Sequence, residues 1–139
     1  MERWEPDNQY SEQESYLMGR LTRTRKLFRF LRDQRLTLFD DAFQAELESM
    51  YRQTGAGREA VPPALLAMGV LLQGYVGCSD AEAVELTVVD LRWQMVLGRL
   101  GTTKPAFSQG ALYNFRHRLI AADMDQRLLE RTGQVARST

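Results

Sequence analysis

Apolar residues recur along this chain at spacings of three and four, and no stretch alternates apolar with polar residues. That spacing places apolar side chains on one side of a helix and therefore predicts helices without a sheet. We expect an all-α fold, a single compact domain of about six or seven helices joined by short loops. Residues 1–11 are polar, contain Pro6 and lack the helical spacing, so we expect an irregular arm before a helical domain over 12–139, with its core over 38–121.

The first half of the chain predicts two helices and a loop. One covers 12–35, with an interruption near 22–24, and its inward residues are Tyr16, Leu17, Leu21, Leu27, Phe28 and Leu31. The other covers 38–54, and its inward residues are Leu38, Phe39, Ala42, Phe43, Leu47, Met50 and Tyr51. Residues 55–59 contain two glycines, which end the second helix and predict a flexible loop.

The next predicted helix is apolar nearly all round. Pro62 and Pro63 open it, because proline is tolerated in the first turn of a helix, and residues 64–76 predict the central core helix. Ser79 is followed three residues later by Glu82, a capping-box pattern that predicts the start of another helix. Asp90 is the expected N-cap of a further helix that extends to Leu97.

The last two predicted helices cover 108–120 and 124–135, and Ser108 is the expected N-cap of the first. Its apolar face consists of Ala111, Leu112, Phe115 and Leu119. The opposite face carries Gln109, Gly110, Tyr113, Asn114 and His117, with Arg116 at its edge. A polar and basic face on an apolar base suits contact with base edges in a DNA major groove, although a solvated surface helix has the same pattern.

We expect the helices that begin at Ser79 and Ser108 to form a helix-turn-helix-like unit. The second helix then lies in the groove with its N-terminal residues on the bases. The base-facing candidates are Gln109, Tyr113, Asn114, Arg116 and His117. Arg118 falls near the core boundary of this helix, so we expect it to pair inside the protein, with Glu85 or Asp90.

Charge is uneven along the chain although the net charge is zero. Residues 20–35 contain seven cations and one acid, a local charge of +6. Such a cluster is suited to phosphate contact, and its candidates are Arg20, Arg23, Arg25, Lys26, Arg29 and Arg32. Lys104, outside this cluster, is a further phosphate candidate. The alternative is that arginine stems cover apolar surface and their charges pair with acids of the next helix.

Residue types that catalysis needs are sparse. His117 is the one histidine and Cys78 the one cysteine, so the sequence offers neither a typical zinc site nor an intrachain disulfide. No phosphate-binding glycine loop and no Gly-x-Ser-x-Gly motif occurs. We expect no enzyme activity, cofactor, metal or small-molecule ligand. The start of the chain is not a signal peptide and the longest apolar run, 64–72, is too short to span a bilayer, so we expect a cytoplasmic protein without a membrane partner.

Several motifs follow one another between Pro63 and Ile120. They read Pro-Ala-Leu-Leu-Ala-Met-Gly-Val-Leu-Leu-Gln-Gly-Tyr, Gly-Cys-Ser-Asp-Ala-Glu-Ala-Val-Glu, Asp-Leu-Arg-Trp-Gln, Leu-Gly and Asn-Phe-Arg-His-Arg-Leu. In this order and at these separations they resemble the N-terminal domain of bacterial insertion-sequence transposases, and the insertion sequence five superfamily is the most similar group. The resemblance covers residues 63–120 directly and most of the chain when the flanking helices are included.

The resemblance implies an all-α domain that binds double-stranded DNA at the terminal inverted repeats of the element and helps to assemble the transposase there. It also implies a bacterial protein that is associated with the nucleoid when bound. In the full family, two Asp and one Glu of a later RNase H-like domain bind metal and cut and join the strands. The chain stops at Thr139, before any strand-forming segment, so we expect that catalytic domain to be absent and assign no catalytic residue.

Two other interpretations stay open at this point. The chain could be a helical protein-interaction module that forms a homodimer through its arginine face or an exposed apolar patch. It could also be a transposase remnant without a selected activity.

Overall fold

A computed structural model describes residues 2–54 and 61–139, and within them every regular element is a helix. The helices are α1 (Glu12–Arg20), α2 (Arg25–Leu38), α3 (Asp41–Thr54), α4 (Pro63–Val76), α5 (Asp80–Val89), α6 (Leu91–Leu97), α7 (Gln109–Ala121) and α8 (Met124–Arg137). The all-α prediction is confirmed, but the described residues form eight helices instead of six or seven. The loop predicted at 55–59 lies outside the described residues.

The additional helix arises at the interruption predicted near residues 22–24. α1 ends at Arg20 and α2 begins at Arg25, because Leu21 takes an extended conformation that stops the first helix. Ser11 and Glu14 form a reciprocal capping box that starts α1. The inward position expected for Tyr16 is wrong, since this side chain is 70% exposed.

The start of α3 also differs from its prediction. Leu38 is the last residue of α2, and α3 begins at Asp41. The side chain of Asp40 accepts a hydrogen bond from the backbone N–H of Phe43 at 2.9 Å. This capping contact starts α3 at Asp41, three residues after the start that the apolar spacing predicted.

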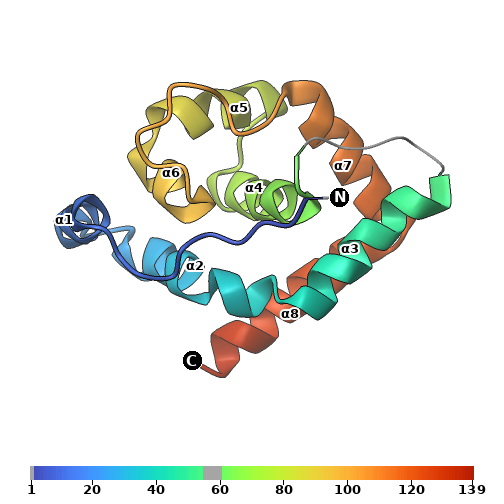
Figure 1. Cartoon of the computed structure of the whole chain (residues 1–139), viewed down its shortest axis with the longest axis horizontal. Coiled ribbons are helices and arrows are strands. Elements are labelled where there is room, and N and C mark those ends of the chain that lie inside the picture. Colours follow the sequence, from blue (N-terminus) through green and yellow to red (C-terminus); the bar gives the residue numbers. More distant parts are fainter. Residues whose placement is uncertain (1, 55–60) are drawn as a thin grey trace.

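α4 forms the centre of the fold, as predicted. It packs against α3, α5, α6 and α7, and Figure 1 shows it in the middle of the other helices. Its residues 63–69, Leu71 and Leu72 are buried. The helix ends at Val76, and Gly77 caps it with a φ of 74°, in the left-handed region that glycine adopts without a steric penalty.

The predicted caps of the later helices are confirmed. Ser79 accepts a hydrogen bond from the N–H of Glu82 at 3.1 Å, and Ser108 accepts one from the N–H of Ala111 at 3.0 Å. The carboxylate of Asp90 accepts from the backbone N–H groups of Arg92 and Trp93 in the first turn of α6. These short-range contacts fix where α5, α6 and α7 begin.

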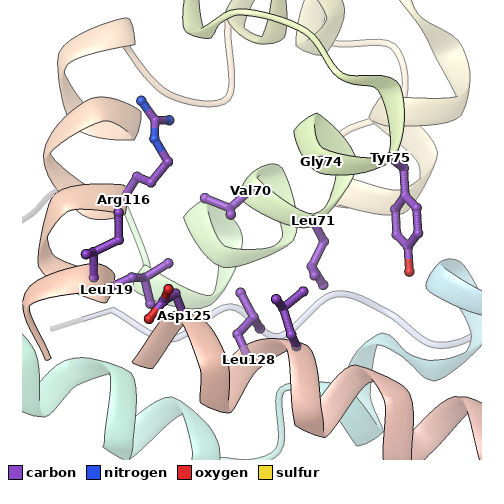
Figure 2. Close-up of a pocket in the computed structure, with 10 residues that line it drawn as sticks. Val70, Leu71, Gly74, Tyr75, Arg116, Leu119, Asp125 and Leu128 are labelled. Carbon is purple, nitrogen blue, oxygen red and sulfur yellow. The ribbon is translucent and has the colours of Figure 1, made fainter. Parts of the chain in front are cut away.

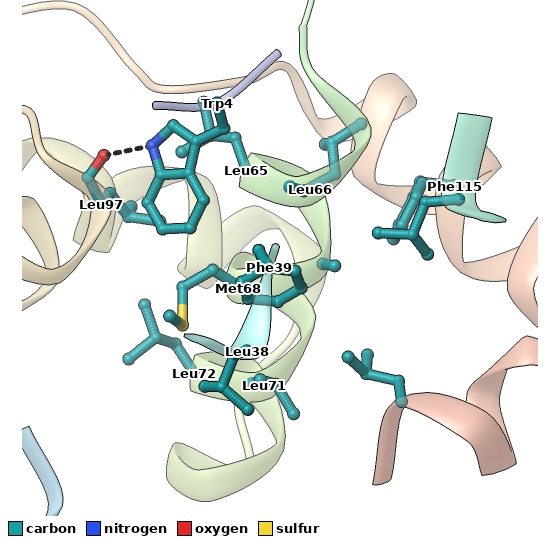
Figure 3. Packing of buried hydrophobic residues seen from close by; sticks show 14 of the residues in the cluster. Trp4, Leu38, Phe39, Leu65, Leu66, Met68, Leu71, Leu72, Leu97 and Phe115 are labelled. Carbon is teal, nitrogen blue, oxygen red and sulfur yellow. Dashed lines mark hydrogen bonds between the residues drawn. The ribbon is translucent and has the colours of Figure 1, made fainter. Parts of the chain in front are cut away.

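Residues 2–10 of the N-terminal arm form no helix, and the arm is packed onto the core. Trp4 is 7% exposed, and its indole N–H donates to the carbonyl of Leu97 at 3.1 Å (Figure 3). Gln44 of α3 exchanges two hydrogen bonds with the backbone of Trp4, at 3.1 and 2.9 Å. The arm therefore connects α3 to the end of α6.

Two arginines of α2 hold the arm and α1 in place from inside. Arg35 is buried and donates to the carbonyls of Met95, Val96 and Asp7 at 2.9, 3.1 and 2.6 Å. Burial, and then the charge of Arg32, lowers the pKa of Arg35 to about 10, so this side chain stays cationic at neutral pH. Arg32 is fully buried and pairs with Glu14 of α1 at 2.8 Å.

Among the residues that the structure describes, no single helix combines the length and the hydropathy that a membrane span needs. α4 and α5 meet the criterion only as a pair, and their axes are bent by 103° at the break between them.

Candidate nucleic-acid interface

α7 is anchored to the core through one face. Leu112, Phe115 and Leu119 are buried, and Ala111 is half-buried. α7 packs against α4, α5 and α8. The buried face predicted for this helix is therefore confirmed, and the opposite face is left to solvent.

The outward face of α7 consists of four exposed polar or aromatic side chains. These are Gln109, Tyr113, Asn114 and His117. The rings of Tyr113 and His117 lie 4.1 Å apart between centroids, and Nδ1 of His117 is 3.0 Å from the carbonyl oxygen of Tyr113. Within the described residues, the side-chain amides of Gln109 and Asn114 form no hydrogen bond. They are therefore the two groups of this face most available to an external partner.

Arg116, the fifth base-facing candidate, is held at the edge of this face. Its guanidinium donates to both carboxylate oxygens of Asp80, at 2.6 and 2.7 Å. Hydrogen bonding from Arg116 is the main cause that lowers the pKa of Asp80, and the same bond raises the pKa of Arg116. Arg116 thus bridges α7 to the first turn of α5.

Arg118 lies toward the inside of the protein, and its guanidinium lies over an aromatic ring. It is half-buried, and its guanidinium carbon lies 4.5 Å from the centroid of the Tyr51 ring. One of its two predicted partners, Asp90, pairs instead with Arg92 at 2.6 Å. The second, Glu85, is exposed on α5.

The predicted phosphate contacts do not gather around α7. Five of them, Arg20, Arg23, Arg25, Lys26 and Arg29, are exposed on α1, α2 and the turn between them. Figure 1 shows α1 and α7 on opposite sides of α4. Lys104, which is also exposed, is the candidate that lies in the segment leading into α7.

Arg32 is a correction to the set of phosphate candidates. Its side chain is 0% exposed and donates to Glu14 and to the backbone carbonyls of Asp7 and Gln9. Its guanidinium also lies 4.4 Å from the centroid of the Tyr10 ring. Because the arm and α1 cover it completely, Arg32 cannot reach a phosphate in this fold.

Two residues of this region, Asp80 and Gln73, were not among the candidates predicted from the sequence. The side-chain amide of Gln73 donates to Asp80 at 2.8 Å, and its oxygen accepts from Arg116 at 3.3 Å. In the sequence Asp80 looks like an ordinary acidic residue of a first helical turn, which gives no sign of a partner in another helix. Among the described residues, no group of three or more His, Cys, Asp or Glu side chains is placed to hold a metal ion.

Comparison with known proteins identifies one family. No curated protein and no solved structure gives a significant match to the chain. The family described as Transposase domain (DUF772) matches residues 19–118, which is more than two thirds of the sequence and extends from the end of α1 into α7. The resemblance found in the motifs between residues 63 and 120 is therefore confirmed, and the chain belongs to the transposase-domain family of the insertion sequence five group.

Proposed function

We propose that this chain is the DNA-binding module of a transposase and that it recognises terminal inverted repeats. The observation that carries the proposal is the exposed face of α7, which presents hydrogen-bonding side chains on an anchored helix in a chain of a transposase family. α5 and α7 pack together, and in this proposal they act as a helix-turn-helix-like unit with α7 in the major groove. The module acts in the bacterial cytoplasm, at the nucleoid when bound, and helps to assemble the transposase on its DNA.

The two amides of α7 carry the sequence recognition in this proposal. Gln109 and Asn114 can each form a bidentate pair with an adenine edge. α1 and α7 lie on opposite sides of α4 (Figure 1), so in this proposal the exposed cations of α1 and α2 bind the sugar-phosphate backbone elsewhere along the duplex. The proposal concerns DNA binding and assigns no strand-transfer step to these residues.

Substitutions at Asn114 and Arg29 are expected to separate the two kinds of contact. Asn114→Ala should cost about 1–3 kcal/mol of binding free energy on the cognate repeat and little on a scrambled duplex. Arg29→Ala should weaken binding to every duplex and reduce the slope of log K against log salt by about 1. Fluorescence anisotropy over a salt series with both duplexes measures the two quantities.

Gln126→Ala is the matched control, because Gln126 is an exposed amide on α8 outside the α7 face. It should leave both affinities unchanged. Weak binding of the wild-type chain that is equal for the repeat and the scrambled duplex and independent of salt would refute the proposed function.

A second candidate function, homodimerisation, is favoured by an apolar groove between α4, α7 and α8. The groove has a volume of about 440 Å³, and Figure 2 shows Val70, Leu71, Leu119 and Leu128 around it. Three more of its side chains, Tyr75, Ile120 and Leu129, are exposed by half or more. An exposed apolar surface that gathers around one groove is typical of a protein contact.

Leu129→Glu is expected to prevent this self-association. Leu129 is 63% exposed beside the groove, and a carboxylate there would lose its hydration in an apolar contact. Light scattering over a concentration series should give a rising mass for the wild-type chain and a monomer mass for the variant. Leu36→Glu, on α2 outside the groove, is the control and should behave as wild type. A monomeric wild-type chain at every concentration would exclude the dimer.

A further inference from the structure

The contact between Arg116 and Asp80 has the geometry that an arginine uses on a phosphate. Two N–H groups of one guanidinium donate to the two oxygens of one anion, at 2.6 and 2.7 Å. The arginine side chain is 30% exposed and the aspartate 14%. Arg116 is therefore accessible from solvent, while its charge is already satisfied within the protein.

Gln73 keeps this pair in place. Its amide nitrogen donates to Asp80 and to the carbonyl of Cys78, at 2.8 and 3.1 Å, which fixes the amide between the end of α4 and the start of α5. Its oxygen accepts from Arg116 at 3.3 Å. Arg116 also lines the apolar groove between α4, α7 and α8, and in Figure 2 its guanidinium points away from Leu119 and Leu128.

Arg116 also lies at the border of the outward face of α7. Its guanidinium carbon is 6.0 Å from the centroid of the exposed Tyr113 ring. A duplex that lies on this face brings phosphates within reach of an arginine at its edge. Whether Arg116 binds one of them depends on how strongly Asp80 retains it.

We propose that Asp80 acts as an internal substitute for phosphate, which keeps Arg116 from contacting DNA and so limits the affinity of the α7 face for DNA of any sequence. This inference rests on the proposed DNA-binding function. The neutral pair adds no net charge beside α7, and it removes one cation from the contacts that do not depend on sequence. Gln109 and Asn114, which read base edges, then account for a larger share of the binding on this face.

The inference makes a quantitative prediction for Asp80→Asn. This change keeps the size of the side chain and removes the charge that holds Arg116. A freed Arg116 adds one phosphate contact, so the slope of log K against log salt should become steeper by about 0.9. Binding to a random duplex in about 0.1 M salt should become about three- to tenfold tighter. Anisotropy titrations over a salt series measure both quantities, and circular dichroism of each variant checks its helix content.

Two further variants make the test specific. Glu82→Gln removes the same charge from an exposed residue of the same helical turn that pairs with no arginine in the described part of the chain, so the slope should stay at the wild-type value. The double variant Asp80→Asn with Arg116→Gln lacks the freed cation and should also return to the wild-type slope. A purely structural role for Asp80 predicts weaker binding in both variants that carry Asp80→Asn.

The outcomes separate this inference from the proposed function. A steeper slope in Asp80→Asn alone supports the inference. A wild-type slope in Asp80→Asn, or an equal change in Glu82→Gln, overturns it while the DNA-binding function stands. A wild-type chain that binds no duplex overturns the proposed function, and this inference with it.

Discussion

Replacement of Glu14 with alanine is expected to lower the free energy of unfolding by about 3–5 kcal/mol, because it leaves a buried charge without its partner. Arg32 is fully buried, and its closest contact to the carboxylate of Glu14 is 2.8 Å. The guanidinium keeps its carbonyl acceptors in the variant but loses the anion that balances its charge. Urea denaturation followed by circular dichroism should show a lower midpoint with an unchanged m-value.

The same pair predicts how stability depends on pH. Burial by itself raises the pKa of Glu14, but hydrogen bonds from Arg32 and from the N–H of Ser11, together with the charges of Arg32 and Arg35, lower it overall. A carboxyl group with a lower pKa in the folded state stabilises the fold fully above its unfolded pKa and loses that effect as the pH falls through the folded value. The wild-type chain should therefore lose stability on acidification more steeply than Glu14→Ala.

Glu12→Ala provides the control for both measurements. Glu12 is exposed in the first turn of the same helix, so its removal should change the free energy of unfolding by no more than about 0.5 kcal/mol. If Glu14→Ala is as stable as Glu12→Ala, the pair between Glu14 and Arg32 is not what holds α1 against α2.

Features that depend on neighbours three or four residues apart could be predicted from the sequence. The N-caps at Ser79, Asp90 and Ser108 and the break between α1 and α2 are decided within one helical turn. The exposed and buried faces of α7 follow from the helical period alone. For this reason four of the five base-facing candidates, all except Arg116, are exposed in the structure.

Features that depend on how helices pack could not be predicted in this way. Arg29 and Arg32 lie one turn apart in the same basic cluster, yet one is exposed and the other is buried under α1 and the arm. The partner of Arg32 is 18 residues away, and that of Arg116 is 36 residues away. Sequence spacing carries no information about such contacts, so the phosphate set contained a buried residue and the restraint on Arg116 was missed.

The second large effect on stability is expected at Phe115, which holds α7 on the core. Phe115→Ala is expected to lower the free energy of unfolding by about 3–5 kcal/mol, because it removes a fully buried ring and leaves a cavity. Phe115 lies between Leu112 and Leu119 on the face that holds α7 against α4, α5 and α8. Urea denaturation should show the loss of stability, and anisotropy should show weaker binding to the cognate repeat.

Tyr113→Ala distinguishes the role of Phe115, which holds α7 on the core, from that of the outward face of α7. Tyr113 is about half exposed and two residues from Phe115, so its removal should cost less than about 1 kcal/mol of stability. It should nevertheless weaken cognate binding, because Tyr113 belongs to the outward face of α7. If Phe115→Ala loses stability but keeps full affinity for the repeat, the position of α7 on the core does not control recognition. A Tyr113→Ala variant with full stability and full affinity would place the DNA contacts on another surface, and the exposed cations of α1 and α2 would then be the first residues to test.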